Sequence, residues 1–171
     1  DCVHICTPHF LHVPMAIDCL KAGKHVLMEK PLAISIHQAQ QLEKICKESS
    51  SILGICFQNR YNDTSLKTKD ILSQGLLGKV LGARAIVTWH RNASYYNSAE
   101  WRGKINTEGG GVLINQAIHT LDLVQWFIGK AVRVKGSIFT SLLEKHIEVE
   151  DTASASIIFD NGATAVFYAT N

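Results

Sequence analysis

Residues 2–31, CVHICTPHFLHVPMAIDCLKAGKHVLMEKP, indicate the fold of the first part of the chain. An apolar stretch over residues 2–6 predicts a strand, and the segment over about residues 11–22 predicts a helix that ends at Gly23. A second apolar strand is predicted over residues 25–29. Two buried strands joined by a helix are typical of a βαβ unit, in which the strands run parallel.

The next segment repeats this pattern. Ser35 and Gln38 form the Ser-x-x-Gln capping box that opens a helix, with Leu42 on its apolar face. A third apolar strand is predicted over residues 52–57. Three parallel strands joined by helices predict an α/β fold, namely half of a doubly wound, Rossmann-type sheet with helices covering both of its faces.

The pattern changes after about residue 59. The predicted elements are a helix, a long strand, an irregular polar and aromatic stretch, an apolar helix that follows three glycines, and three further strands, over residues 64–73, 80–91, 92–108, 112–128, 132–142, 152–159 and 163–170. The sequence Asp160-Asn161-Gly162 between the last two strands is a strong hairpin signal. Strands without intervening helices predict an α+β unit with an open, mainly antiparallel sheet.

The composition narrows the class of protein. The 171 residues include 17 Lys and Arg against 15 Asp and Glu, a net charge of +2, which is far from the basic surface that nucleic-acid binding requires. The 5 cysteines, an odd number without CxxC spacing, are typical of reduced thiols in a cytoplasmic protein. No apolar run approaches the ~20 residues of a membrane span. We expect a soluble, cytoplasmic protein that binds neither nucleic acid nor membrane.

Polar residues follow the predicted parallel strands at the edge where open α/β sheets bind ligands. They are Thr7-Pro8, Glu29-Lys30-Pro31 and Gln58-Asn59-Arg60. Because Pro31 holds the preceding residue in an extended conformation, the Lys30 side chain is expected to have a defined direction. A solvated surface lysine beside a turn is the alternative interpretation.

A narrow polar stripe follows the three glycines at 109–111. At 100° per residue, Asn115, His119 and Asp122 fall within a sector of about 60° on an otherwise apolar helix. Three buried polar groups are costly unless they are paired or functional. A catalytic role and a satisfied core network, in which Asp122 holds His119, are both consistent with the stripe. The glycines would permit close approach of a ligand to the backbone.

Other kinds of site find less support. The remaining histidines lack a metal-ligand spacing, no GxSxG motif suggests a nucleophile, and we expect no metal site. Aromatic residues cluster with two arginines between residues 89 and 102. This cluster suits stacking on a sugar or nicotinamide ring and equally a loop anchored by aromatic side chains.

Four segments, taken together and in order, resemble the Gfo/Idh/MocA family of nicotinamide-dependent oxidoreductases, which includes glucose-fructose oxidoreductase and inositol dehydrogenase. They are TPHFLHVPMAIDCLKAGKHVLMEKP, FQNRY, EWRG and EGGGVLINQAIHTLDLVQWFIG. The resemblance implies a partial dinucleotide-binding domain over residues 1–58 and a partial domain for substrate binding and oligomerisation over residues 59–171. It also implies hydride transfer between NAD or NADP and a secondary hydroxyl of a sugar, inositol or related metabolite. A homodimer or homotetramer that associates through the open sheet is implied as well.

The resemblance further implies roles for individual residues. Lys30 would contact the nicotinamide side and the substrate hydroxyl, His119 would be the general acid/base, and Asn115 would complete the catalytic set with support from Asp122. The residues expected to line the cofactor are Thr7, Pro8, His12, Glu29, Lys30, Pro31, Gln58, Trp101 and Arg102. The residues expected to contact the substrate are Arg60, His90, Asn115 and His119. Many family members carry Asp where this chain has Asn115, and because an amide cannot accept a proton, no two-step relay through this position is expected.

The family's first βαβ unit, with its glycine-rich pyrophosphate loop, does not occur in these residues, and no GxGxxG motif is found. We therefore expect the sequence to be the middle of a longer enzyme, with the activity belonging to the full-length parent. The alternative function is a non-catalytic dimerisation or interaction module that retains the oxidoreductase fold.

Overall fold

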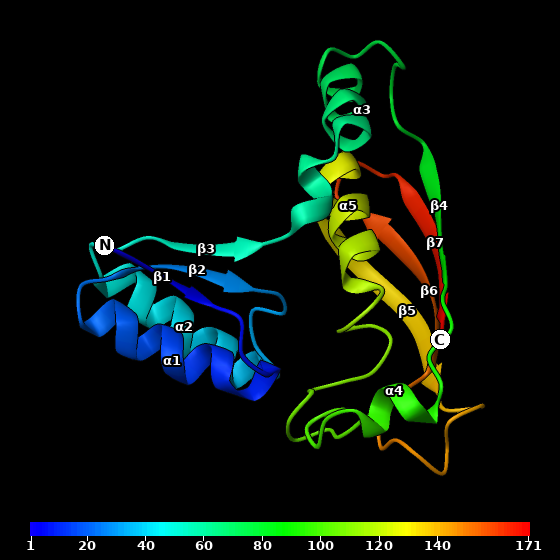
Figure 1. Cartoon of the computed structure of the whole chain (residues 1–171). Helices are drawn as coiled ribbons and strands as arrows, with labels where there is room; N and C mark the ends of the chain where they lie inside the picture. The colour runs from blue at the N-terminus through cyan, green and yellow to red at the C-terminus, as the bar shows by residue number, and fades with distance from the viewer.

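The computed structural model describes all 171 residues and contains two sheets (Figure 1). The first sheet is fully parallel, with the strand order β1-β2-β3. Its elements in chain order are β1 (Cys2–Ile5), α1 (His9–Lys21), β2 (His25–Glu29), α2 (Ile36–Glu48) and β3 (Leu53–Cys56). The predicted half of a Rossmann-type sheet is confirmed.

Both crossover helices lie on the same face of this sheet, whereas the sequence predicted helices on both faces (Figure 1). Val26 and Met28 point to the helices and are buried, while Leu27 points the other way and is 42% exposed. The reason is topological. Two right-handed crossovers that advance in the same direction across a sheet place both helices on one side.

The capping box that begins α2 forms as predicted. Ser35 adopts an extended conformation, and its hydroxyl accepts a hydrogen bond from the backbone N–H of Gln38 at 3.2 Å. The Gln38 side chain in turn accepts from the backbone N–H of Ile34 at 3.4 Å, one residue earlier than the usual reciprocal bond. These contacts fix the start of the helix that follows the Lys30-Pro31 turn.

The second sheet is mixed, with the strand order β4-β7-β6-β5. The elements of this part are η1 (Gln58–Tyr61), α3 (Asp63–Ser73), β4 (Gly82–Thr88), α4 (Ala93–Asn97), α5 (Ile118–Ile128), β5 (Ala131–Phe139), β6 (Thr152–Phe159) and β7 (Thr164–Thr170). The β5–β6 and β6–β7 pairs are antiparallel, as expected, while β4 pairs in parallel with β7. Two helices and two strands separate β4 from β7 in the chain, so local sequence held no sign of this pairing.

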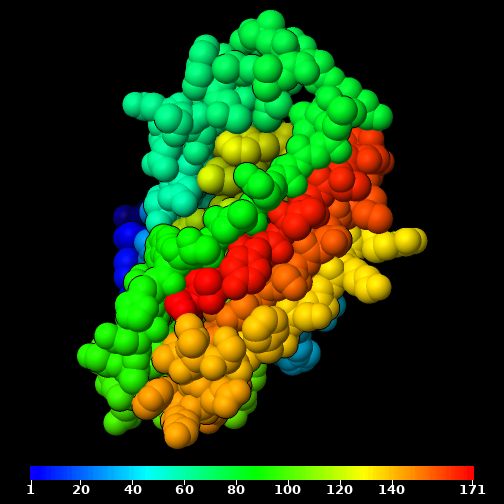
Figure 2. Space-filling model, turned by 90° about the vertical axis from the view of Figure 1, so that its right-hand side faces the viewer, coloured from blue at the N-terminus to red at the C-terminus, as the bar shows by residue number.

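One face of the mixed sheet is covered and the other is open. Helix α5 lies on the face that is turned toward the first sheet (Figure 1), where Leu121 and Val124 pack against a core that includes Phe159 and Phe167. The opposite face forms a broad surface over all four strands (Figure 2). Val166, 61% exposed, lies on this surface.

Helix α5 begins at Ile118, several residues later than the sequence predicted. Glu150, which precedes β6, accepts hydrogen bonds from the backbone N–H groups of residues 111–113, through its carboxylate at 2.9 and 3.0 Å and its own carbonyl at 2.9 Å. These backbone N–H groups therefore bind the segment before β6, and no helix begins at them. Asn115 consequently lies in an irregular turn just before α5.

Two further findings concern the whole chain. None of its helices is long and apolar enough to cross a membrane. No group of three or more His, Cys, Asp or Glu side chains is arranged to hold a metal ion.

Candidate active site

Lys30 and Asn115, 85 positions apart in the chain, meet between the two sheets. The Lys30-Pro31 peptide bond is cis, and the Lys30 side chain is partly buried. Its Nζ donates hydrogen bonds to the Asn115 carbonyl at 2.9 Å and to Asn115 Oδ1 at 3.1 Å. An ammonium has three donors, so one remains for a ligand.

The other end of the Asn115 amide contacts a residue that the sequence did not single out. Asn115 Nδ2 donates to Glu108 Oε1 at 2.5 Å and to Tyr95 Oη at 3.3 Å. The second carboxylate oxygen of Glu108 accepts from the backbone N–H of Gly103. Glu108 is 0% exposed, although a glutamate in front of three glycines is expected to be solvated in a loop.

Burial acts on both charged groups of this network. It lowers the pKa of Lys30, against the opposing effect of Glu29 and Glu108. Burial also raises the pKa of Glu108, while its hydrogen bonds from Gly103 and Asn115 act in the other direction. Each charge thus partly offsets the effect of burial on the other, although no direct ion pair joins them.

His119 lies near the start of α5, with its ring 6.2 Å from that of Phe57 in an edge-on arrangement. Its Nδ1 is buried and has no hydrogen-bond partner. Burial, followed by the nearby Lys30 ammonium, lowers the pKa of His119. The side chain borders a pocket of about 360 Å³ whose lining also includes Gln58, Thr88, Trp89 and Gln116.

Asp122 does not hold His119, contrary to the core network that the sequence allowed. It is engaged by Arg60, whose Nε and Nη2 donate to its two carboxylate oxygens at 2.7 and 2.5 Å. The Arg60 guanidinium also lies 5.5 Å from the ring of Trp126. Arg60, expected to contact substrate, is therefore committed to an ion pair that fastens η1 to α5.

Two buried histidines fasten the turns that follow the strands. His12, 0% exposed, contacts the Pro31 carbonyl through Nδ1 at 2.8 Å and the Thr7 carbonyl through Nε2 at 2.9 Å. His12 thus joins the turns after β1 and β2 and leaves no surface for a cofactor. His9 Nδ1 donates to the Glu108 carbonyl at 2.9 Å, and burial lowers the pKa of His9 to about 4.

The Trp-Arg pair packs within the chain's own aromatic cluster. Arg102 Nη1 donates to Tyr95 Oη at 2.5 Å, and its guanidinium lies 4.7 Å from the Trp101 ring. The Trp101 ring is 4.7 Å from that of His9, so this loop touches α1. These contacts therefore support the interpretation in which the aromatic side chains anchor the loop.

The other predicted residues lie at the rim of the cleft or outside it. Pro8 is the N-cap of α1, and Glu29 is the last residue of β2. Gln58 is exposed at the start of η1. His90 is exposed just after β4, and its carbonyl accepts a hydrogen bond from its neighbour Arg91.

The glycines that precede Asn115 approach the protein itself, whereas the sequence suggested approach to a ligand. A Cβ at Gly109, which has φ +87°, would lie 2.5 Å from the Ile34 side chain. A Cβ at Gly111 would lie 1.8 Å from the Glu150 carbonyl. Only glycine allows the loop to pack this closely against the segment before α2 and the start of β6.

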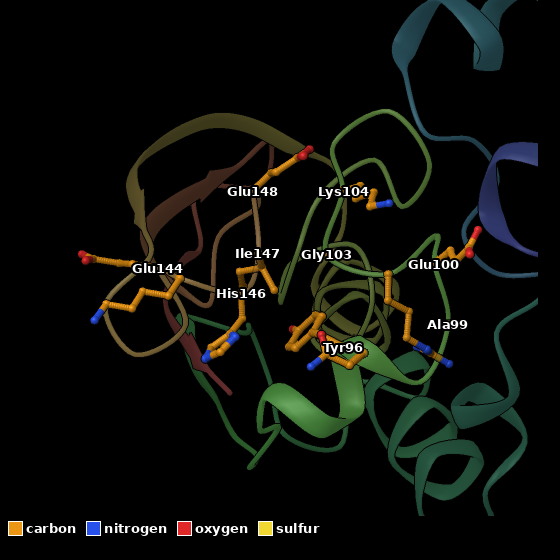
Figure 3. A pocket seen from close by; sticks show the side chains of 12 residues that line it. Tyr96, Ala99, Glu100, Gly103, Lys104, Glu144, His146, Ile147 and Glu148 are labelled. Atoms are coloured by element: carbon orange, nitrogen blue, oxygen red, sulfur yellow. The ribbon is translucent and has the colours of Figure 1, made fainter.

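A separate hollow of about 490 Å³ lies between the loop after α4 and the loop that joins β5 to β6 (Figure 3). Glu100, Lys104, Glu144, His146 and Glu148 border it, but their side chains point in different directions and do not converge on a common point (Figure 3). Neither Lys30 nor His119 lines it. We therefore place the candidate active site where Lys30 meets Asn115, with His119 nearby.

Comparison with known proteins identifies the family of the chain. Residues 1–57 match the model of the oxidoreductase family with an NAD-binding Rossmann fold, and residues 65–171 match that of the GFO/IDH/MocA C-terminal domain. The chain belongs to the Gfo/Idh/MocA family. It spans about half the length of the curated relatives it matches.

Two solved relatives of this Gfo/Idh/MocA chain hold NADH together with a second ligand. The crystal structure of the WlbA dehydrogenase from Bordetella pertussis, in complex with NADH and UDP-GlcNAcA, superimposes with a TM-score of 0.94 at 35% identity over 99% of this chain and 52% of that one. Levoglucosan dehydrogenase in complex with NADH and levoglucosan gives a TM-score of 0.91 at 27% identity, over 99% and 47%. Oxidoreductase P35 of Formosa agariphila is 28% identical over 95% of this chain and 50% of its own length.

Two polar residues near the candidate site were missed by sequence reasoning. Glu108 resembles an ordinary loop residue, and only its position before the glycines hints at a special environment. Gln116 is 4% exposed, and neither atom of its amide has a hydrogen-bond partner. Gln116 directly follows Asn115 in the chain, and the sequence offered no sign of its burial.

Proposed function

We propose that the protein is an NAD(P)-dependent oxidoreductase that transfers a hydride between nicotinamide and a secondary hydroxyl of a sugar, inositol or related metabolite. The observation that supports this most strongly is the meeting of Lys30, just after β2, with Asn115, just before α5, while His119 on α5 lies near enough to the Lys30 ammonium for that charge to lower its pKa. A lysine with one free donor and a histidine with a lowered pKa suit the two tasks of an alcohol dehydrogenase without a metal, which are to orient a hydroxyl and to remove its proton.

The roles of the residues follow from their surroundings. Lys30, held by Asn115, directs its remaining donor to the substrate oxygen. His119 is neutral at physiological pH because burial and Lys30 disfavour its charged form, so it can accept the hydroxyl proton. Asn115 cannot take a proton and serves as a hydrogen-bonding group that fixes Lys30. Proton transfer therefore depends on His119.

The residues present fit a nicotinamide at the carboxyl edge of the parallel sheet. Thr7, Pro8, Glu29 and Lys30 lie at the ends of β1 and β2, at the position where open α/β sheets bind nucleotides. A bound nicotinamide would supply the two-electron chemistry by accepting or returning the hydride. His12 and Pro31 are fully buried, so they would support this edge from behind.

We further propose that the chain divides into a partial dinucleotide-binding domain over residues 1–58 and a partial substrate-binding and oligomerisation domain over residues 59–171. Two separate hydrophobic cores, one under each sheet, support this division. A homodimer or homotetramer through the open face of the mixed sheet is part of the proposal.

The test uses the full-length protein with NAD and NADP and a panel of inositols, free sugars, levoglucosan and UDP-linked uronic acids. We expect absorbance of the reduced cofactor to increase with at least one of these, and Lys30→Ala to abolish the increase, while Lys44→Ala, at an exposed position on α2, does not. Absence of turnover together with absence of NAD(P) binding in calorimetry would favour the non-catalytic interaction module.

A further inference from the structure

Glu108 is a buried carboxylate to which the proposed reaction assigns no task. Its side chain is 0% exposed, and its two oxygens accept from the Gly103 backbone N–H and from Asn115 Nδ2. Both partners are donors, which suits an ionised carboxylate because that group only accepts hydrogen bonds. A buried negative charge needs compensation, and the Lys30 and Arg102 cations lie close enough to favour it.

The contact with Glu108 decides which way the Asn115 amide faces. An amide has a donating end and an accepting end. The donating Nδ2 is directed to Glu108 Oε1 at 2.5 Å and to Tyr95 Oη at 3.3 Å. The accepting Oδ1 is therefore left to face Lys30 Nζ at 3.1 Å. Rotation of the amide by a half-turn would place N–H donors against an ammonium.

The charge of Glu108 also acts on Lys30 through space. Lys30 forms no ion pair of its own, and the acidic groups that favour its ammonium form are Glu29 and Glu108, while burial and Arg102 oppose it. A chain of two hydrogen bonds thus runs from the cation through a polarised amide to the carboxylate.

We infer that Glu108 is a positioning residue, which orients the Asn115 amide and thereby holds the Lys30 ammonium in place. The inference also explains why position 115 holds an amide in this chain. An aspartate there would set two carboxylate oxygens about 2.5 Å apart, where both cannot remain ionised. The effect on turnover rests on the proposed function, whereas the effect on Lys30 does not.

Three variants of the full-length protein test the inference by exchanging the carboxylate at position 108 and the amide at position 115, singly and together. In Glu108→Gln, the NH₂ end of the new amide must face one of two donors, either the Gly103 N–H or Asn115 Nδ2. Asn115 therefore loses its fixed orientation. In Asn115→Asp, the carboxylates repel each other. We expect each change to lower kcat by roughly 10- to 100-fold with little change in KM, because a misplaced Lys30 harms chemistry more than binding.

The double variant Glu108→Gln/Asn115→Asp restores a complete set of partners. The new amide at position 108 can accept from Gly103 and donate to the carboxylate at position 115, which in turn accepts from Lys30. We expect kcat to recover to within about 5-fold of the wild type, since the misplacement is removed. A double variant no better than Asn115→Asp alone would refute the inference, and this comparison holds even if Glu108→Gln fails to fold.

A second measurement needs neither cofactor nor activity. In the wild-type protein, the hydrogen-bonded Lys30 ammonium should give a slowly exchanging ¹H–¹⁵N signal in NMR spectra, assigned by its loss in Lys30→Arg. The signal should disappear in Glu108→Gln, return in the double variant, and persist in Glu100→Gln, at an exposed position in the same loop. Persistence in Glu108→Gln would overturn the positioning role, whether or not the protein oxidises any sugar.

Discussion

His119 is the residue whose titration should set the pH dependence of the reaction. Its pKa is lowered by burial and by Lys30, so the neutral, proton-accepting form persists below the ordinary value near 6.5. We expect kcat/KM for alcohol oxidation to rise with pH through a midpoint below about 6.5. His119→Ala should lower it by about 10²- to 10⁴-fold and remove this ionisation, measured as a pH–rate profile.

The control for this prediction is His37→Ala, since His37 is exposed on α2, away from the cleft. An unchanged profile in His119→Ala would show that Lys30 or water accepts the proton. The role proposed for His119 would then be withdrawn.

The buried side chain of Gln116 is expected to lower the stability of the protein. Its buried amide lacks partners, which costs free energy that an apolar side chain of similar size would not incur. We expect Gln116→Leu to raise the free energy of unfolding by about 1 to 2 kcal/mol in urea denaturation. Gln41→Leu, at an exposed site on α2, should change it by less than about 0.5 kcal/mol.

A loss of stability in Gln116→Leu would mean that an ordered water already satisfies the amide. A gain in stability combined with a raised KM would indicate that the amide is kept unpaired for the substrate.

At the scale of elements, helix α1 is joined to the loop before the glycines through His9. The pKa of His9 is about 4 in the folded state, against 6.5 in its unperturbed state. Below pH 6.5 the unfolded chain therefore binds a proton that the folded chain does not, so stability falls as the pH falls toward 4. The loss over this interval amounts to about 3 kcal/mol.

We expect His9→Gln, which keeps a donor for the Glu108 carbonyl, to remove most of this acid sensitivity in urea denaturation at about pH 4.5 and pH 7. His4→Gln, at an exposed position on β1, is the matched control. Equal acid sensitivity in wild type and His9→Gln would show that His9 is not the group responsible.

At the scale of the whole molecule, the open face of the mixed sheet is the surface proposed for self-association (Figure 2). Ile86, Val166 and Tyr168 lie on it and are 54%, 61% and 39% exposed. Burial of exposed apolar side chains such as these is a main driving force of association between subunits. We expect Val166→Lys in the full-length protein to shift the sedimentation velocity profile from dimer or tetramer to monomer.

Ile36→Lys is the control, because Ile36 is 78% exposed but lies on α2, far from this sheet in the fold. A monomeric wild-type protein, or an unchanged profile in Val166→Lys, would contradict association through this face.

Periodicity and turn chemistry determined most of the architecture. The alternation of short apolar strands with helices indicated the parallel sheet. The capping box at Ser35 indicated the start of α2, and Asp160-Asn161-Gly162 indicated the last hairpin. All three features depend on residues that are neighbours in the chain. The sequence also indicated Lys30 and His119 as candidate catalytic residues, and their roles remain proposals. What it did not indicate depends on residues far apart in the chain.

Only the tertiary structure decided the partners of the polar groups. Asp122 is paired with Arg60 and not with His119, Asn115 lies outside α5 because Glu150 binds the backbone before it, and Glu108 is buried against Asn115 and His9. Each of these contacts joins segments from different parts of the chain, and many alternative pairings satisfy the same local sequence. Burial selects among them, because a polar group taken out of water must find the partner that packing brings within reach.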